Sequence, residues 1–214
     1  MKRWTLSAAL ACAVTCVAAL SAQANTDLII SEYVEGSSFN KAIEIWNRTG
    51  APIDLTAGGY KIQMYFNGAV AVGGTVVLSG VLADNDTYVV THDQATLVLL
   101  NLADQTSSGL LFNGDDAVVL VKSAANTTVD AFGQIGNDPG TEWGAGLQST
   151  ADNTLRRKPT VCDGDLIGTD LFDPSIQWDG FASDTFSGIG SHTDACGPTP
   201  VTPVTWGTIK SVYR

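Results

Sequence analysis

The sequence predicts an all-β protein, an antiparallel sandwich or barrel with one short helix and long loops. Short runs rich in β-branched and aromatic residues recur along the chain, and Gly, Asn, Asp or Ser, which favour turns, bound each run. In the opening hairpin apolar and polar side chains alternate, as in a half-buried strand. The predicted strands cover residues 28–34, 41–47, 60–66, 75–78, 87–91, 116–122, 128–133 and 154–158.

The first 24 residues predict a secretory signal peptide. Lys2 and Arg3 precede an apolar run, and Ala22-Gln23-Ala24 resembles a small-residue cleavage site, so cleavage is expected between Ala24 and Asn25. No later stretch has the roughly 18–20 apolar residues that a membrane span requires. We therefore expect a mature chain that is exported, either secreted, periplasmic or held at the cell surface.

The charge of the chain disfavours several classes of partner. Its net charge is −11, and loss of Lys2 and Arg3 with the leader would change this to −13. Such a surface repels the phosphate backbone of nucleic acids and anionic lipids. A protein or a cell-surface component is the more suitable partner.

Two of the four cysteines, Cys12 and Cys16, lie in the predicted leader. Cys162 and Cys196 remain in the exported part, where an even pair favours a disulfide. A zinc site is the alternative, with His192 four residues before Cys196, but no second Cys or His flanks Cys162.

The opening hairpin, "SEYVEGSSFNKAIEIWN" at residues 31–47, holds three glutamates, Glu32, Glu35 and Glu44. Strict alternation groups Ile30 with Glu32 and Val34 on one face, and Ile43 with Ile45 on one face of the next strand. Glu32 and Glu44 then face each other if the two strands pair in the right register. Ile29, Ile43 and Ile45 are the predicted core contacts.

The only segment with a helical pattern follows the strand at 87–91. Asp93 is a candidate N-cap for a helix of about ten residues, with Ala95, Leu99 and Leu102 at helical spacing. The segment "TLVLL" at 96–100 also suits a strand.

The C-terminal third is rich in loops, and large aromatic side chains are expected to pin these loops by burial. One domain is predicted over residues 25–196, followed by a Pro/Thr-rich linker at 197–205 and a short tail at 206–214. In the tail, Trp206, Ile209 and Tyr213 form one stripe of a short amphipathic helix. This stripe indicates a candidate docking or sorting segment. The aromatic side chains expected to act as pins are Trp143, Trp178, Phe172, Phe181 and Phe186.

Oxygen-rich turns are the candidates for a metal site. Asp115 and Asp116 lie in "NGDDA", and Asp163 and Asp165 lie in "CDGDLIGTD". Oxygens of this kind bind Ca²⁺. The second segment does not match the twelve-residue EF-hand loop, because Pro174 occupies the position of the closing Glu. Asp and Asn also serve turns without an ion, which is the favoured interpretation.

Catalytic signatures are weak. His92 and His192 lie in no recognisable motif, and "GIGSH" at 188–192 lacks the final Gly of a nucleophile elbow. The basic cluster Arg156-Arg157-Lys158 is expected to form ion pairs with Asp152 or Asp163 rather than bind phosphate. We predict no catalytic residue and no cofactor.

Five motifs follow one another along the chain: "LIISEYVEGSSFNKAIEIWN", "LFNGDDAVVLVK", "DAFGQIGNDPGTEWG", "STADNTLRRK" and "FDPSIQWDGFASDTFSGIGSH". Together they resemble the bacterial lamin-tail domain. This family occurs in secreted proteins and beside the catalytic domain of extracellular nucleases of the endonuclease/exonuclease/phosphatase superfamily. The resemblance implies an immunoglobulin-like β-sandwich and an accessory rather than catalytic role.

The functional hypothesis from the sequence is a secreted, non-catalytic lamin-tail module that binds a partner or acts as a scaffold. Association with an extracellular nuclease on another chain, or weak metal-dependent nuclease activity, is the first alternative. Calcium-dependent adhesion is the second.

Overall fold

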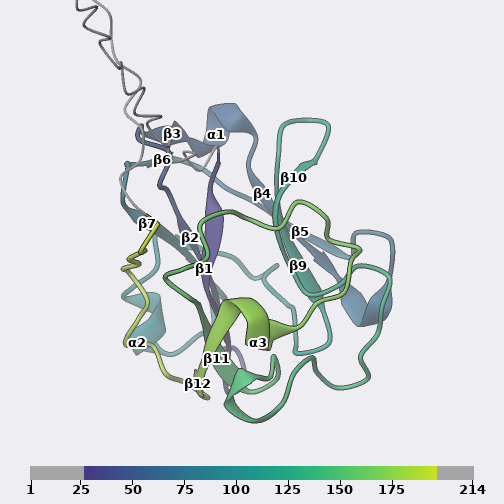
Figure 1. Ribbon diagram of the computed structural model, residues 1–214. Helices are drawn as coiled ribbons and strands as arrows, with labels where there is room; N and C mark the ends of the chain where they lie inside the picture. Colours follow the sequence, from purple (N-terminus) through teal and green to yellow (C-terminus); the bar gives the residue numbers. More distant parts are fainter. Residues whose placement is uncertain (1–26, 197–214) are drawn as a thin grey trace, which may run out of the picture.

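Two β-sheets face each other in the computed structural model, which describes residues 27–196 (Figure 1). The larger sheet has the strand order β12-β11-β1-β2-β7-β8, and the smaller has the order β10-β9-β4-β5. All strand pairs are antiparallel except β7 with β8. The predicted immunoglobulin-like β-sandwich is confirmed. The predicted leader, its cleavage site, the linker and the tail lie outside the described residues.

The strands of the larger sheet are β1 (Ile29–Glu35), β2 (Lys41–Trp46), β7 (Thr87–Thr91), β8 (Gln105–Thr106), β11 (Asn153–Arg157) and β12 (Trp178–Ala182). Those of the smaller sheet are β4 (Lys61–Tyr65), β5 (Gly74–Val77), β9 (Ala117–Lys122) and β10 (Thr127–Phe132). A separate pair is formed by β3 (Ile53–Asp54) and β6 (Val81–Leu82). Within residues 27–196, no helix is long and apolar enough to cross a membrane.

The main core fills the space between the sheets. Aromatic rings form its centre: Tyr33 of β1 stacks on Phe132 of β10 with ring centroids 4.0 Å apart, and Trp178 meets Phe132 edge to face. Trp178, Phe132 and Tyr33 are fully buried, and each buried aromatic ring removes a large apolar area from water. Contacts across this core therefore link β1, β10 and β12, which are distant in sequence.

A β-bulge in β1 overturns part of the predicted face assignment. The β1–β2 register shifts between Ile30 and Glu32, so strict alternation fails at Ser31. Ile30 therefore shares the core with Tyr33 rather than facing the same way as Glu32 and Val34. The predicted core positions Ile43 and Ile45 are confirmed, whereas Ile29 is buried but lies outside the main core cluster.

The predicted helix after β7 is much shorter than expected. Helix α2 (Leu97–Leu100) has Thr96 at its N-cap position, so Asp93 is not the cap. The reason is local: the His92 Nδ1 atom accepts a hydrogen bond from the Gln94 N–H, which holds 93–95 in a turn. Two further short helices, α1 (Leu55–Gly58) and α3 (Pro174–Gln177), have Asp54 and Asp173 as side-chain caps.

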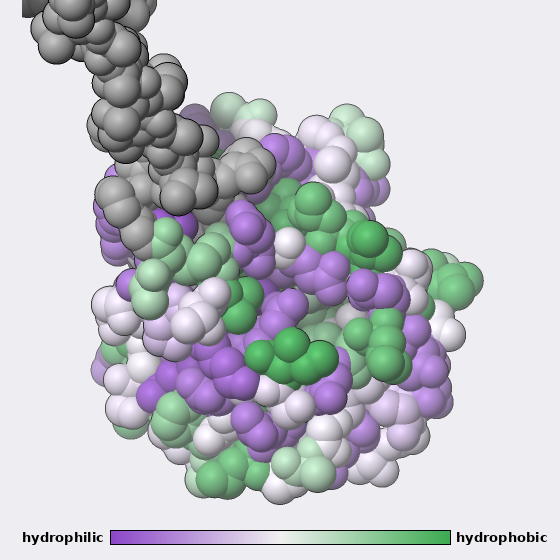
Figure 2. All heavy atoms as spheres, in the orientation of Figure 1, coloured by the Kyte–Doolittle hydropathy of each residue, from purple (hydrophilic) through white to green (hydrophobic). Residues whose placement is uncertain are grey.

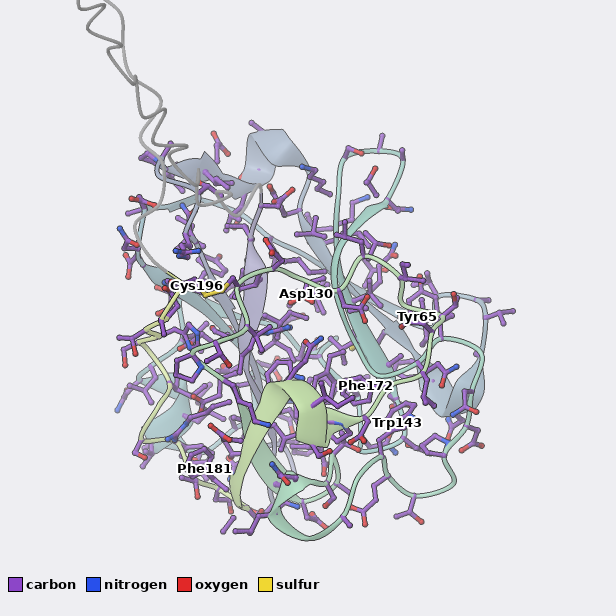
Figure 3. The ribbon with its side chains drawn as sticks, viewed as in Figure 1. Tyr65, Asp130, Trp143, Phe172, Phe181 and Cys196 are labelled. Atoms are coloured by element: carbon purple, nitrogen blue, oxygen red, sulfur yellow. A yellow bond between two sulfur atoms is a disulfide. The ribbon has the colours of Figure 1, made fainter. Side chains whose placement is uncertain are left out.

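The C-terminal third is pinned by aromatic side chains and by the Cys162–Cys196 disulfide, whose Cα atoms are 5.8 Å apart. Trp143 meets Phe172 edge to face, and both lie near the lower end of the smaller sheet (Figure 3). Phe181 of β12 lies beneath the Arg156 guanidinium. The region nevertheless contains α3 and β12, which sequence patterns do not predict.

Candidate functional site

Residues 183–196, here called the strap, cross the outer face of the larger sheet. In Figure 1 the strap is the yellow segment that leaves β12 and passes α2 toward β7. Its first anchor is the Asp184 carboxylate, which accepts hydrogen bonds from the Ser37 N–H, the Ser37 hydroxyl and the Asn40 side-chain amide. The strap therefore begins at the β1–β2 turn.

Apolar side chains form the second anchor. Ile189 is buried and Phe186 half-buried in a cluster separate from the main core. This cluster lies on the sheet face that points away from the other sheet, where side chains of the strap and of the α2 region pack on it together. Its other buried members are Val34, Ala42, Val89, Ala95 and Leu99.

Beneath the middle of the strap, Glu32 of β1 lies directly opposite Glu44 of β2. Glu44 Oε1 accepts a hydrogen bond from the Ser31 hydroxyl at 2.6 Å, and its Oε2 accepts one from the Gly190 N–H at 2.6 Å. Glu32 Oε2 accepts one from Arg156 Nε at 2.9 Å. Glu32 Oε1 is buried, and no group within residues 27–196 hydrogen-bonds to it.

Burial controls the acidity of this pair. Desolvation raises the pKa of Glu32 to about 8; the charge of Arg156 lowers it, and that of Glu44 raises it further. Desolvation also raises the pKa of Glu44, against hydrogen bonds from Ser31, Gly190 and Ser191 that favour its ionised form. The closed strap therefore favours a proton on Glu32 at neutral pH.

Gly188 is required for the close contact between strap and sheet. A Cβ atom at this position would lie 2.1 Å from Arg156 Nε and 2.4 Å from Glu32 Oε2. The strap backbone thus covers the Glu32–Arg156 ion pair directly. A side chain at position 188 would force either the strap or these two side chains to move.

The end of the strap has three further anchors. His192 meets Trp46 edge to face, with ring centroids 4.8 Å apart, and Asp194 forms an ion pair with Arg48 at 2.5 Å. Burial lowers the pKa of His192 to about 4, with a further lowering by the charge of Arg157. The Cys162–Cys196 disulfide then closes the segment.

The partners predicted for the basic cluster are wrong. Arg156 pairs with Glu32, and Arg157 pairs with Asp130 at 2.5 Å, rather than with Asp152 or Asp163. The pairs join strands that are distant in sequence, so proximity along the chain could not reveal them. Lys158 donates hydrogen bonds to backbone carbonyls at 175 and 176.

The four candidate metal ligands lie in turns. Asp116 accepts hydrogen bonds from the backbone N–H groups of Asn67 and Asn113, and Asp165 accepts one from that of Ile167. Asp115 lines a polar pocket of about 330 Å³ together with Glu35 and Asp152. Nowhere in residues 27–196 do three or more His, Cys, Asp or Glu side chains form a group that could hold a metal ion.

The two histidines serve packing. His92 is buried and stacks on Phe39 with ring centroids 4.4 Å apart, and His192 packs on Trp46 as described above. Glu32 and Glu44 do converge, as the hairpin register allows, but a guanidinium and the strap backbone occupy the space around them. The arrangement is that of a carboxyl pair covered by the strap.

Comparison with protein families identifies the chain. The family model described as "Lamin Tail Domain" matches residues 21–136. The chain belongs to the lamin tail domain family. No curated protein and no solved structure matches it. The matched segment ends after β10, so β11, β12 and the strap of this lamin tail domain lie beyond it.

Sequence reasoning missed the strap and several of its partners. Asp184, Gly188 and Gly190 carry its polar and close contacts, and none of them was a candidate site residue. The available signal was "SGIGSH", in which two glycines flank an isoleucine in a segment without strand or helix periodicity. Such glycines often permit close backbone approach.

A second surface of this lamin tail domain combines apolar and acidic side chains. It comprises α3 and the loop before it, residues 163–177, and is here called the α3 surface. Figure 2 shows apolar side chains separated by hydrophilic ones on this face. Leu171 is 85% exposed and Ile176 68% exposed, and both line a shallow pocket of about 50 Å³ with Asp165 and Asp173.

Backbone contacts hold the α3 surface in place. The Asp165 N–H donates to Asp130 Oδ1, and the Ile135 N–H donates to the Gly168 carbonyl. Leu166 and Ile167 are also largely exposed, although the loop that carries them is fixed. Exposed aliphatic side chains on a fixed loop are typical of a binding surface.

Proposed function

We propose that this lamin tail domain is a secreted, non-catalytic interaction module, and that its α3 surface docks a partner protein or a cell-surface component. The observation that carries the proposal is the exposure of Leu166, Ile167, Leu171 and Ile176 on a loop fixed by hydrogen bonds. Burial of such side chains against a partner is favourable by about 25 cal/mol per Å² of apolar area. The family assignment supports the proposal, because lamin tail domains are immunoglobulin-like, non-catalytic modules.

The charge of the α3 surface specifies the partner. Asp163, Asp165, Asp170 and Asp173 lie in the same segment as the exposed aliphatic side chains, and the whole chain has a net charge of −11. A segment that presents apolar side chains together with Lys or Arg complements this surface, whereas a phosphate backbone is repelled.

The predicted C-terminal tail has this chemistry. Trp206, Ile209 and Tyr213 alternate with Lys210 and Arg214. The tail lies outside the described residues, and its role as a docking segment remains part of the proposal. Equivalent segments on another protein chain are the partners that we expect for the α3 surface.

Affinity capture tests the proposal. The intact protein, a chain ending at Cys196 and the double variant Leu171→Ser/Ile176→Ser are used as bait in the exported protein fraction. Leu147→Ser is the matched control, because Leu147 is 56% exposed and lies outside the α3 surface. We expect partners captured by the intact protein and by the control to be lost with the double variant. Retention of every partner by the double variant would contradict the proposal.

The same experiment separates the alternatives. A captured extracellular nuclease would identify the module as an accessory subunit. Digestion of plasmid DNA by the pure chain with Mg²⁺ or Ca²⁺, abolished by Asp115→Ala or Glu44→Ala, would instead show that the chain is an enzyme. Partner binding that requires Ca²⁺ would favour calcium-dependent adhesion.

A further inference from the structure

The covered carboxyl pair has one more negative group than the cation beside it can compensate. Glu32 and Glu44 are direct cross-strand partners, a position that places Cβ atoms roughly 4.5–5.5 Å apart. Arg156 contributes a single positive charge through its hydrogen bond to Glu32. With both carboxyls ionised, a buried site therefore holds two negative charges and one positive charge, which is unfavourable in a medium of low polarity.

The other groups packed around Glu32 do not remove this imbalance. From β12, Asp179 lies opposite Arg156 in the register and is exposed. From the strap, backbone groups of Gly188 and Gly190 contact the pair, while His192 and Asp194 lie further along and pair with Trp46 and Arg48. Ser31 and Ser187 add hydroxyl groups without charge.

The buried Oε1 atom of Glu32 indicates that a bound proton balances the charge of the site. Oε1 is buried without a hydrogen-bond partner within residues 27–196, which is costly for an ionised carboxylate and far less so for a protonated one. The raised pKa of Glu32, about 8, agrees with this geometry. Ionised Glu32 needs water at Oε1, and the strap lies close against the pair, since a Cβ atom at Gly188 would be 2.4 Å from Glu32 Oε2.

We propose that the strap is a pH-gated cover, closed over Glu32 and Glu44 when the pair holds one proton and displaced when both carboxyls are ionised. Opening of this cover exposes the apolar cluster of Val34, Val89 and Leu99 on the outer sheet face. The device is distinct from the α3 surface. The exposure of that cluster therefore depends on pH.

The direction of the pH dependence follows from the two pKa values of Glu32. With the strap open and Glu32 hydrated, the pKa of Glu32 returns to the ordinary glutamate value of 4.5, and with the strap closed it is about 8. The open state therefore binds fewer protons between these values, so opening increases as pH rises through this window. One proton predicts a rise of about tenfold per pH unit between roughly 4.5 and 8, and a plateau above.

Hydrogen exchange at the Gly190 amide measures strap opening, since this N–H donates to Glu44 in the closed state. All proteins compared carry His192→Phe, because His192 in the strap also titrates between about 4 and 6.5 and would open the strap in acid. In this background the full chain with its disulfide intact, otherwise wild type, is compared with Glu32→Gln from pH 5.5 to 7.5, after correction for the intrinsic exchange rate. The otherwise wild-type opening constant is expected to rise about 70-fold over these two pH units, and that of Glu32→Gln to stay within about threefold. An unchanged slope in Glu32→Gln, or a flat otherwise wild-type profile, would overturn the proposal.

Glu142→Gln is the matched control, because it removes a glutamate in the 136–150 loop, outside the strap and its contacts, and it should follow the wild type. A second measurement does not depend on any variant. Titration of the Glu32 carboxyl carbon by NMR in the folded protein should give a midpoint well above 4.5. A midpoint at the ordinary value would refute the gate even if Glu32→Gln failed to fold.

Discussion

Arg157 and Asp130 join the two sheets of the sandwich through an ion pair in which both side chains are fully buried. Arg157 lies at the end of β11 and Asp130 in β10. The Arg157 guanidinium also donates to the Ile30 carbonyl at 2.6 Å and to Gln177 Oε1 at 2.7 Å, and it stacks on Trp178. In Figure 3, Asp130 is labelled in the middle of the molecule, between the two sheets.

Asp130→Asn should destabilise the fold strongly. It leaves the Arg157 charge buried without a carboxylate and weakens the bonds from the Ile30 and Asp165 N–H groups. Removal of one partner from a buried pair costs about 3–5 kcal/mol. Urea unfolding monitored by tryptophan fluorescence measures the change in the free energy of unfolding. Asp179→Asn, at an exposed position of β12, is the control. A loss below about 1 kcal/mol would show that the pair contributes little.

Gly188→Ala should loosen the strap without altering charge. The added methyl group would overlap Arg156 and Glu32, and overpacking of this kind costs about 1–3 kcal/mol. We expect faster hydrogen exchange at Gly190 and a lower unfolding midpoint. Ser183→Ala, at an exposed position of the strap, is the control and should leave both quantities nearly unchanged. Wild-type exchange in Gly188→Ala would show that the strap does not press on the ion pair.

Acid should weaken the strap through a different residue. Burial lowers the pKa of His192 to about 4 from the ordinary histidine value of 6.5, so the unfolded chain binds more protons between these values. Stability contributed by neutral His192 is therefore lost as pH falls from about 6.5 to 4, by about 1–2 kcal/mol after allowance for its partial exposure. His192→Phe, which keeps an aromatic ring against Trp46, should reduce this loss in thermal melts at pH 7 and pH 4.5. Equal losses in the two proteins would exclude His192 as the cause.

Reduction of the disulfide should lower stability but leave the sandwich folded. The Cys162–Cys196 bond closes a loop with a sequence separation of 34, for which the chain-entropy model gives about 3–4 kcal/mol. The double variant Cys162→Ser/Cys196→Ser, compared with wild type with and without reductant, isolates this contribution. A reductant effect that persists in the double variant would point to another origin.

Calcium should leave the melting temperature unchanged. Asp116 and Asp165 already accept backbone hydrogen bonds in turns, which explains their presence without an ion. Differential scanning calorimetry compares the melting temperature in about 5 mM Ca²⁺ with that in EDTA and checks this expectation. A rise of more than about 3 °C with Ca²⁺, lost in Asp115→Asn, would revive the calcium site.

The strands and the opposition of Glu32 and Glu44 could be predicted because they depend on local alternation and on a short hairpin. The face of Ile30 could not be predicted, because the bulge at Ser31 breaks the alternation of side chains. The Ser31 hydroxyl at this bulge donates to Glu44 on the next strand. The partners of Arg156 and Arg157 were missed for a related reason. Their carboxylates are 124 and 27 residues away, and only the closed sheets bring them together.

The position of β11 beside β1 has a consequence for any shortened form of the chain. Tyr33 pairs with Leu155 in this register, so one of the two neighbours of β1 is supplied by residues far beyond the family match, which ends at residue 136. A polypeptide cut at that boundary would present β1 as a bare edge with unpaired N–H and C=O groups, a template for aggregation. The autonomous folding unit is therefore longer than the segment by which the family is recognised, and expression trials should extend through Cys196.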